Sequence, residues 1–492
     1  MDTQSLVIYG AYLISAAFFI LGLKRLGKVR SARGGNTLSG VGMAIAIVAA
    51  LFEANHTLTL EGQVGIGWTW VAGGAIVGIL IGGIAAIRVQ MTEMPEMVAL
   101  FNGSGGVASA LVGGSYVFRE LLENESAAGL TLADVPGVGG SSAFTVILSI
   151  LIGMLTLTGS IVAYLKLRGK FDAPILLPGR NFINLLLLFG SIGIGAWAAF
   201  GVSDPTTTLW VFIGVAVAAS ILGVMAVIPI GGADMPVVIS LMNSYSGLAA
   251  CATGFVLNNS LLIVAGALVG ASGLILTKIM CVAMNRSLAN VLFAGFGATA
   301  SEADKKDARD YKNVRSADPE SAAMILEAAE SVIFVPGYGL AVAQAQHACK
   351  ELGELLKSRG CKVTYAIHPV AGRMPGHMNV LLAEADVPYD ELVEMDEINP
   401  EFKNTDVVIV AGANDVVNPV ALTDPNSPIA GMPILTVHEA KTVFVIKRSL
   451  SPGFAQIKNP LFEAPNAMMM FGDAKGMLQG MITELKEALK AA

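Results

Sequence analysis

Charged side chains are scarce in this sequence, and basic ones are in the minority. Asp, Glu, Lys and Arg make up 14% of the 492 residues, whereas soluble domains carry about 25%. Together with 54% hydrophobic residues, this shortage indicates a chain that is largely embedded in a membrane. The net charge of −7 leaves no surplus of cations for the phosphates of a nucleic acid, so nucleic acid is not an expected partner.

Cysteine and processing signals are equally sparse. The four cysteines, Cys251, Cys281, Cys349 and Cys361, form no C-x-x-C pair, so we expect buried thiols and neither a disulfide framework nor a zinc site. The first apolar segment, residues 1–24, lacks an A-x-A cleavage site and is too long for the apolar part of a signal peptide. We therefore interpret it as a retained membrane span.

Nine apolar segments follow one another in the first part of the chain. Each is close to the ~20 residues that cross a ~30 Å hydrocarbon layer as a helix. We expect spans at 6–23, 38–53, 65–87, 93–118, 142–166, 182–201, 207–230, 235–257 and 260–282. Lys and Arg gather in the odd-numbered loops, as at Lys24, Arg25 and Arg33. Because cytoplasmic loops carry the excess of Lys and Arg, we expect the N-terminus outside and the C-terminal half in the cytoplasm.

Several polar residues lie inside the expected spans or at their mouths. They are Glu93, Glu96 and Asn102 in the fourth span, Asp234 at the mouth of the eighth, and Asn243 and Ser244 within it. An intramembrane Asn often makes only a hydrogen bond between helices, but a cluster of polar groups beside a carboxylate favours a hydrated path. No motif for a larger cargo accompanies them, so we interpret the set as a proton path.

The composition changes after the ninth span. Residues 298–318 are rich in Ser, Ala, Asp and Lys and predict a solvated linker. It separates a membrane domain at 1–297 from a second domain at 319–492. In that domain we expect helices at 319–330, 339–358, 376–385 and 473–490, and strands at 332–335, 362–367, 391–395, 406–410, 434–437 and 443–447. The sequence thus predicts a polytopic α-helical membrane domain followed by a cytosolic, doubly wound α/β domain of Rossmann type.

A glycine turn follows the first expected strand of this domain. Gly337-Tyr338-Gly339 stands between an apolar strand and a small-residue helix, which is where a Rossmann domain receives the pyrophosphate of a dinucleotide. A lone G-x-G is also common as a plain tight turn, and Val342 occupies the place of the third glycine. The turn alone therefore leaves both interpretations open.

Two further features favour NADP over NAD. The second expected strand runs into His368 without the carboxylate that holds the ribose 2′-OH of NAD. A later strand ends in Lys447-Arg448-Ser449, and two cations with a hydroxyl suit a 2′-phosphate. A solvated basic strand end would show the same residues.

Long, specific strings connect the chain to a known family. They include Met91-Thr92-Glu93-Met94-Pro95, Gly231-Gly232-Ala233-Asp234-Met235-Pro236, Asn243-Ser244-Tyr245-Ser246-Gly247, His368-Pro369-Val370-Ala371-Gly372-Arg373-Met374-Pro375-Gly376-His377 and Gly412-Ala413-Asn414-Asp415. On these strings the chain resembles the beta subunit of the proton-translocating nicotinamide nucleotide transhydrogenase over nearly its whole length. The resemblance implies a membrane domain that passes protons inward and a cytosolic domain that binds NADP(H). NAD(H) would be bound by a separate alpha subunit.

The resemblance also implies direct hydride transfer between two nicotinamides, so we expect no catalytic side chain. The residues implied to bind NADP(H) are Gly337, Tyr338, Gly339, Leu340, Ala341 and Val342 at the turn; Val370, Ala371, Gly372, Arg373, Met374 and Pro375 in a second loop; Gly412, Ala413, Asn414 and Asp415 near the nicotinamide; Lys447, Arg448, Ser449 and Gly453 near the 2′-phosphate; and Gly472, Asp473 and Ala474. The segment 415–431 resembles a lid that closes on the nucleotide.

Two positions depart from the family pattern. Some relatives have a histidine where this chain has Asn102, so either a helix of the partner subunit supplies the relay or water ordered by Asn102 and Asn243 carries the proton. Many relatives have a tyrosine where this chain has Phe454. The contact that the tyrosine hydroxyl makes in those relatives is lost here. His368 and His377 belong to the family string, and we expect no metal site.

Family membership would also define partners and location. We expect an alpha subunit, in one or more chains, with the NAD(H) domain and further membrane helices, and a second beta subunit in a dimer of protomers. The complex would lie in the lipid bilayer of the bacterial inner membrane. The alternative is a nucleotide-gated channel or transporter with a cytosolic NADP-sensing domain, although no selectivity-type pore sequence is found.

Overall fold

The computed structural model describes residues 3–27, 29–60, 67–123, 129–136, 138–170, 175, 177–294, 311–374 and 376–491. The chain divides into two compact units. The first comprises Met1–Tyr164, Pro178–Ala226 and Leu241–Leu274, and the second comprises Leu165–Leu177, Val227–Ser240 and Ile275–Ala492. The second unit thus includes the ends of several long helices as well as the C-terminal half. Most of the expected linker lies outside the described residues.

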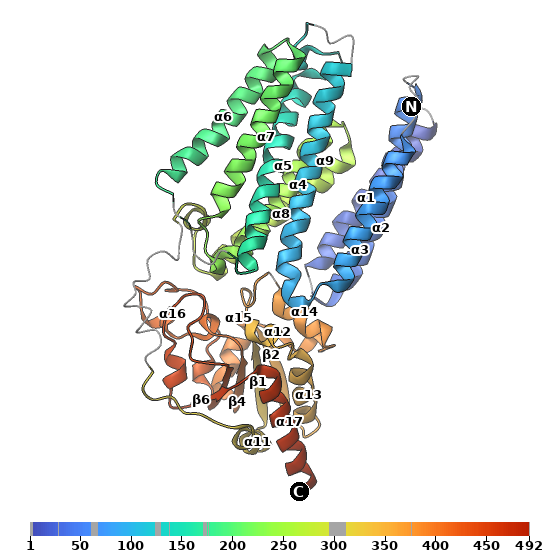
Figure 1. Ribbon diagram of the computed structural model, residues 1–492. Coiled ribbons are helices and arrows are strands. Elements are labelled where there is room, and N and C mark those ends of the chain that lie inside the picture. Colours follow the sequence, from blue (N-terminus) through green and yellow to red (C-terminus); the bar gives the residue numbers. More distant parts are fainter. Residues whose placement is uncertain are drawn as a thin grey trace. The chain divides into compact units, whose positions relative to one another are not determined.

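Nine helices in the described part of the chain are long and apolar enough to cross a membrane, which confirms the nine expected spans (Figure 1). They are α1 (Thr3–Leu26), α2 (Val29–Leu60), α3 (Trp68–Arg88), α4 (Met94–Phe118), α5 (Gly139–Leu167), α6 (Arg180–Gly201), α7 (Pro205–Val227), α8 (Met235–Val256) and α9 (Ser260–Ala283). The largest difference concerns α2, expected at 38–53. Hydropathy marks only its apolar middle, and the helix continues into polar sequence at both ends.

Small residues allow the helices of the first unit to approach closely. A Cβ atom on Gly247 of α8 would lie 2.5 Å from the backbone nitrogen of Gly270 in α9. Hydroxyls add hydrogen bonds between helices: Ser149 Oγ of α5 donates to Ser109 O of α4 at 2.8 Å and lies 2.8 Å from Thr253 Oγ1 of α8. Such contacts are the usual basis of helix association in lipid. They define α4, α5, α8 and α9 as a packed group.

The second unit is built on a parallel sheet, and within the described residues its strand order is β3-β2-β1-β4-β5-β6. The strands are β1 (Ser331–Pro336), β2 (Lys362–Ile367), β3 (Leu392–Glu394), β4 (Val407–Ala411), β5 (Thr442–Lys447) and β6 (Ala467–Phe471). This order is that of a doubly wound Rossmann sheet and confirms the expected fold class. The order reverses between β1 and β4, which is where such sheets bind their ligands.

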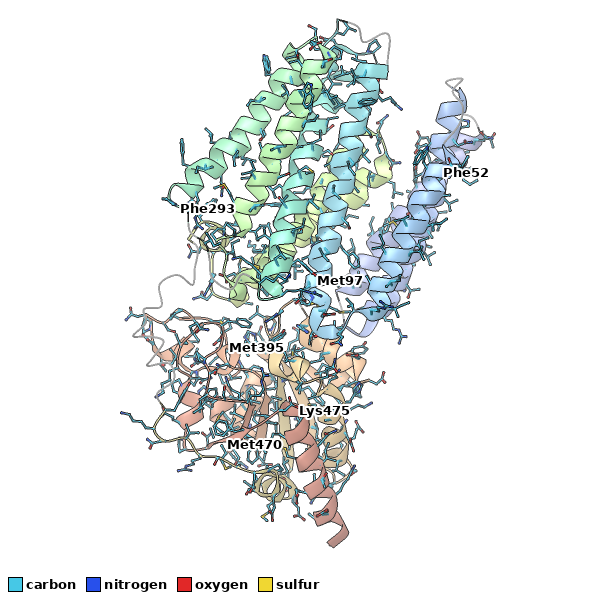
Figure 2. All side chains as sticks on the ribbon, in the orientation of Figure 1. Phe52, Met97, Phe293, Met395, Met470 and Lys475 are labelled. Atoms are coloured by element: carbon cyan, nitrogen blue, oxygen red, sulfur yellow. The ribbon has the colours of Figure 1, made fainter. Side chains whose placement is uncertain are left out.

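Helices and buried side chains cover the sheet on both sides. The helices are α11 (Pro319–Glu327), α12 (Tyr338–Val342), α13 (Gln346–Lys357), α14 (His377–Glu384), α15 (Met395–Ile398), α16 (Val420–Thr423) and α17 (Ala474–Ala491), and α17 packs against α11 and α13. Apolar side chains from the strands, such as Val335, Val408 and Val445, form one core. Figure 2 shows the side chains of this unit around the strands, Met395 and Met470 among them.

Three expectations about this domain were wrong. The strand expected at 434–437 is absent from the described sheet; Ile434 and Leu435 are buried without pairing to a strand. Strand β6 was missed because its sequence, Ala-Met-Met-Met-Phe, has no β-branched residue. The single helix expected at 339–358 is two helices, since Gln344 adopts φ 47° and ends the first.

Candidate functional site

A pocket of about 500 Å³ lies at the point where the strand order reverses. All of its lining belongs to the second unit. It is formed by the carboxyl ends of five strands: residues 337–339 after β1, 370–373 after β2, 412–416 after β4, 446–449 at and after β5, and 472–474 after β6. Open parallel sheets bind nucleotides at this edge. The structure therefore brings together the segments that the sequence had marked separately.

The glycine turn is joined to the turn after β4. Gly337 N donates to Ala411 O at 2.9 Å, and Gly339 N donates to Gly412 O at 3.0 Å. A Cβ atom on Gly339 would lie 2.6 Å from Gly412 Cα, and Gly412 itself adopts φ +72°. The glycines are thus required where two backbones touch, in addition to any approach of a phosphate. Leu340 and Ala341 are buried beneath the turn and do not line the pocket.

The loop after β2 carries Arg373 to the pocket. The Arg373 guanidinium lies 4.3 Å from the centre of the Tyr338 ring, and its Nη1 donates to Leu167 O at 2.8 Å. The loop is therefore held at the glycine turn on one side and at the end of α5 on the other. Met374 does not line the pocket, and Pro375 lies outside the described residues.

Two buried histidines hold this loop in place. His377 Nδ1 accepts from Arg373 N at 3.0 Å, and His368 Nδ1 accepts from Val370 N at 3.2 Å. The ring proton of His368 must then be on Nε2, which lies 2.8 Å from Pro433 O. Burial lowers the pKa of both histidines to about 4. They are neutral structural groups near neutral pH.

We expect acid to weaken this part of the domain through these two histidines. Their folded pKa of about 4 lies below the ordinary 6.5, so the stability they contribute is complete above pH 6.5 and is lost as the pH falls toward 4. Hydrogen exchange of the β1 and β2 peptides in the full chain, corrected for intrinsic rates, measures this loss. The His368→Asn variant, which can accept the same N–H without titrating, should lose less stability over that range. Parallel losses in both proteins would contradict the assignment.

At the other end of the pocket the carboxylate of Asp415 is enclosed. Its Oδ2 accepts from Ala455 N at 3.1 Å, whereas Oδ1 is buried without a hydrogen-bond partner among the described residues. Burial raises the pKa of Asp415, and the backbone N–H of Ala455 and the charge of Lys447 oppose that rise most strongly. Asn414, the preceding residue, accepts at its carbonyl from Asn459 Nδ2 at 3.1 Å. This end of the pocket therefore offers an unfilled acceptor.

Cations and hydroxyls line the wall that follows β5. Lys447 Nζ donates to Ser451 O at 2.8 Å and lies 5.2 Å from the centre of the Phe462 ring. Burial lowers the pKa of Lys447, although Asp415 opposes the change. Arg448, Ser449 and Phe454 are exposed and also line the pocket, as Gly453 does. Two cations beside serine hydroxyls are suited to a phosphate group.

Sequence reasoning missed Arg286, which lies just beyond the end of α9. Its Nη1 donates to both carboxylate oxygens of Asp234 at 2.8 Å, and Asp234 is 2% exposed. Arg286 lines the pocket, together with Met284 and with Gly232 and Pro236 on either side of Asp234. A signal was present, because a carboxylate at the mouth of one span requires a cation when it is buried. Arg286 follows the neighbouring span.

The other polar residues of the expected proton path lie in the first unit. Glu96 and Asn102 are buried in α4, and Glu93 precedes that helix. Ser244 Oγ of α8 donates to Gly270 O at 2.6 Å. Helices α4 and α8 touch at Gly105, whose Cβ would lie 2.5 Å from Ser246 Oγ. Asn102 lies three residues before Gly105 in α4, and Asn243 lies three residues before Ser246 in α8. Each asparagine is therefore about one helical turn before the contact.

In the described part of the chain, no three His, Cys, Asp or Glu side chains could together hold a metal ion. All four cysteines are free thiols; Cys281, Cys349 and Cys361 are buried, and Cys251 is half-buried.

The architecture and the pocket define the class of the protein. It is a polytopic membrane protein with an α/β domain of Rossmann type, the fold that commonly binds nucleotides. The chain belongs to the family of NAD(P) transhydrogenase beta subunits, whose pattern matches residues 8–484. It is 45% identical over 481 residues to the NAD(P) transhydrogenase subunit beta of Rhodospirillum rubrum, which covers 98% of this chain and 99% of that protein. A second sequence of that name from the same species matches equally well. The family implies binding of a nicotinamide nucleotide and an alpha subunit as partner.

Proposed function

We propose that this chain binds NADP(H) in the pocket at the switch point and exchanges hydride with NAD(H) bound by an alpha subunit. We further propose that this exchange is coupled to inward movement of protons across the bacterial inner membrane. The observation that carries the assignment is the wall of Lys447, Arg448 and two serines at the carboxyl end of β5. A 2′-phosphate is the group that distinguishes NADP from NAD, and this wall suits it.

The remaining lining fits the rest of the nucleotide. The turn at 337–339 and the guanidinium of Arg373 would hold the pyrophosphate. Asn414 and Asp415 would lie near the nicotinamide, where the unfilled Oδ1 of Asp415 can accept a hydrogen bond from the ligand. The buried orphan acceptor supports this placement, because such groups normally have a partner in the working state.

The bound nicotinamide supplies the hydride chemistry, and no acid–base side chain is needed for it. This chain contributes proximity, orientation and exclusion of water from the reacting ring. The apolar lining from Ile429 and Met432, both buried, serves the last purpose.

Coupling of hydride transfer to proton movement requires a structural element with two states. Both the bound nucleotide and the proton must shift the equilibrium between these states. We propose α8 for this role. Asp234 precedes it and is paired with Arg286, which lines the pocket, so a change in nucleotide charge acts on the pair over a short distance. Asn243 lies about two and a half turns further along the helix. Asn102 and Asn243 would order the water that carries the proton further.

We propose an N-terminus on the outer side of the inner membrane and a cytoplasmic nucleotide domain, on the distribution of Lys and Arg between loops. A second beta subunit in a dimer of protomers is part of the same proposal.

Nucleotide turnover tests the function against the gated channel. Membranes that hold this chain and its alpha subunit should reduce an NADP analogue with NADH, as followed by absorbance of the reduced analogue. Membranes with the alpha subunit alone are the control and should show none. Binding of NADPH without any turnover in the complete complex would favour a channel with a nucleotide-sensing domain.

A further inference from the structure

Just beyond the end of α9, Asn285 adopts the left-handed backbone conformation. Asn285 has φ 49°. Its backbone N donates to Val282 O at 2.9 Å, and Arg286 N donates to Cys281 O at 2.8 Å. These two bonds and the left-handed residue form a Schellman cap, in which glycine or asparagine ends a helix. The cap accounts for the left-handed backbone conformation of Asn285. It does not account for the role of the side-chain amide.

That amide contacts the lid, the segment 415–431. Asn285 Nδ2 donates to Ala430 O at 2.6 Å. The next residue, Gly431, has φ +68°, and a Cβ atom there would lie 2.6 Å from Asn285 Nδ2. The lid is thus shaped to receive this amide, and only glycine fits at the contact. Gly431 N also donates to Ala421 O at 2.7 Å, which ties the contact point to the rest of the lid.

The bond closes one wall of the nucleotide pocket. Met284 and Arg286, the neighbours of Asn285, both line the pocket, and so do Ile429 and Met432 on either side of the contacted dipeptide. Asn285 itself is exposed to solvent and is not part of the lining. Loss of its amide would therefore free the lid without removing a group that touches the nucleotide.

We propose that Asn285 is a latch that holds the lid over NADP(H) and sets the rate at which the nucleotide leaves. It is a positioning residue, and the inference rests on the proposed binding of NADP(H) in this pocket. Because Arg286 is the adjacent residue and pairs with Asp234, opening of the latch and rearrangement of that ion pair occur at the same helix end. The latch thus connects the release of the nucleotide to the Asp234–Arg286 pair, which joins the start of α8 to the end of α9.

The chain offers a matched pair of variants. Asn285→Gly keeps the left-handed cap, which glycine adopts freely, and removes only the amide. Asn258 caps α8 in the same way: it has φ 51°, and its N donates to Phe255 O at 3.3 Å while Asn259 N donates to Gly254 O at 2.8 Å. Asn258→Gly therefore makes the same chemical change at a cap that is not in contact with the lid. Asn285→Asp is a second test variant of unchanged size, in which the donor becomes an acceptor facing Ala430 O.

The measurement is release of NADPH from the full chain in complex with its alpha subunit, followed by NADPH fluorescence after addition of excess NADP⁺, without NAD(H). Asn285→Gly should release NADPH roughly 2- to 12-fold faster, the range for the net loss of one hydrogen bond. Asn285→Asp should be at least as fast, and Asn258→Gly should match the wild type. Gly431→Ala should speed release in the wild-type background by a larger factor than in the Asn285→Gly background, where its clash is gone.

Unchanged release from both Asn285 variants, or equal acceleration by Asn258→Gly, would overturn the latch while leaving NADP(H) binding intact. Equal effects of Gly431→Ala in the two backgrounds would also overturn it. A wild-type complex that binds no NADPH would instead refute the proposed function, and the latch with it.

Discussion

Joint replacement of Lys447 and Arg448 by alanine is expected to weaken NADP(H) binding by about 3 kcal/mol, which is roughly a 100-fold increase in Kd. Most of this loss should come from Lys447, which is half-buried and has its pKa lowered by burial. A cation in such a place gains more from a nearby phosphate than one in water does. Arg448 is exposed and should contribute less.

The same strand supplies the control for this double variant. Lys441 precedes β5, at the opposite end from Lys447, and its Nζ donates to Asp406 Oδ1 at 2.7 Å. Lys441→Ala removes one positive charge at a distance from the pocket and should leave the Kd within about two-fold, since exposed pairs contribute little. Calorimetric titration of the full chain with NADPH gives both values. An unchanged Kd in the Lys447 and Arg448 variant would show that the 2′-phosphate is not bound there.

Asp234→Asn is expected to abolish proton pumping by the complex and to slow reverse transhydrogenation, because a coupled cycle cannot skip its proton step. The carboxylate is buried and is bound at both oxygens by Arg286. Its loss would leave Arg286 without its anion at the wall of the pocket, and removal of one member of a buried pair strongly disturbs the other. NADP(H) binding should survive, since Asp234 does not itself line the pocket.

Proteoliposomes with an interior pH dye report the pumping directly, with NADPH and an NAD analogue supplied outside. Asp204→Asn is the control, because Asp204 also precedes a span but caps α7 at its exposed end, where it accepts from Thr207 N at 2.8 Å. This variant should acidify the interior at nearly the wild-type rate. Wild-type rates in Asp234→Asn would remove Asp234 from the path and leave Glu93, Glu96 or the partner subunit to account for it.

The fold was largely predictable because its signals are local. Spans such as α9 are continuous apolar runs, and parallel strands such as β4 are buried on both faces and therefore apolar throughout. Strand β6 escaped prediction because a methionine-rich run carries no β signal, so only its pairing with β5 defines it. The break at Gln344 likewise depends on a backbone angle that the residue type does not announce.

The candidate site was predictable only in part. The segments that meet in the pocket were marked by the glycine turn, by the basic end of β5 and by the family strings. The contacts of α9 with the rest of the site were not, because Arg286 and Asp234 are 52 residues apart and Asn285 and Ala430 are 145 apart. Such pairs show no periodicity in a single sequence. The glycines at 337 and 339 had a second role that was also hidden, since they accommodate the backbone after β4.

The most direct test of the account is the choice of nucleotide by the full chain without its alpha subunit. We expect NADPH to saturate a single site per chain, and NADH to occupy no more than about a tenth of the sites at a ten-fold higher concentration than the NADPH Kd, since it lacks the phosphate that Lys447 and Arg448 would hold. Displacement of a fluorescent NADPH signal by NADH measures this selectivity. Binding of NADH as tight as that of NADPH would contradict the assignment of this pocket.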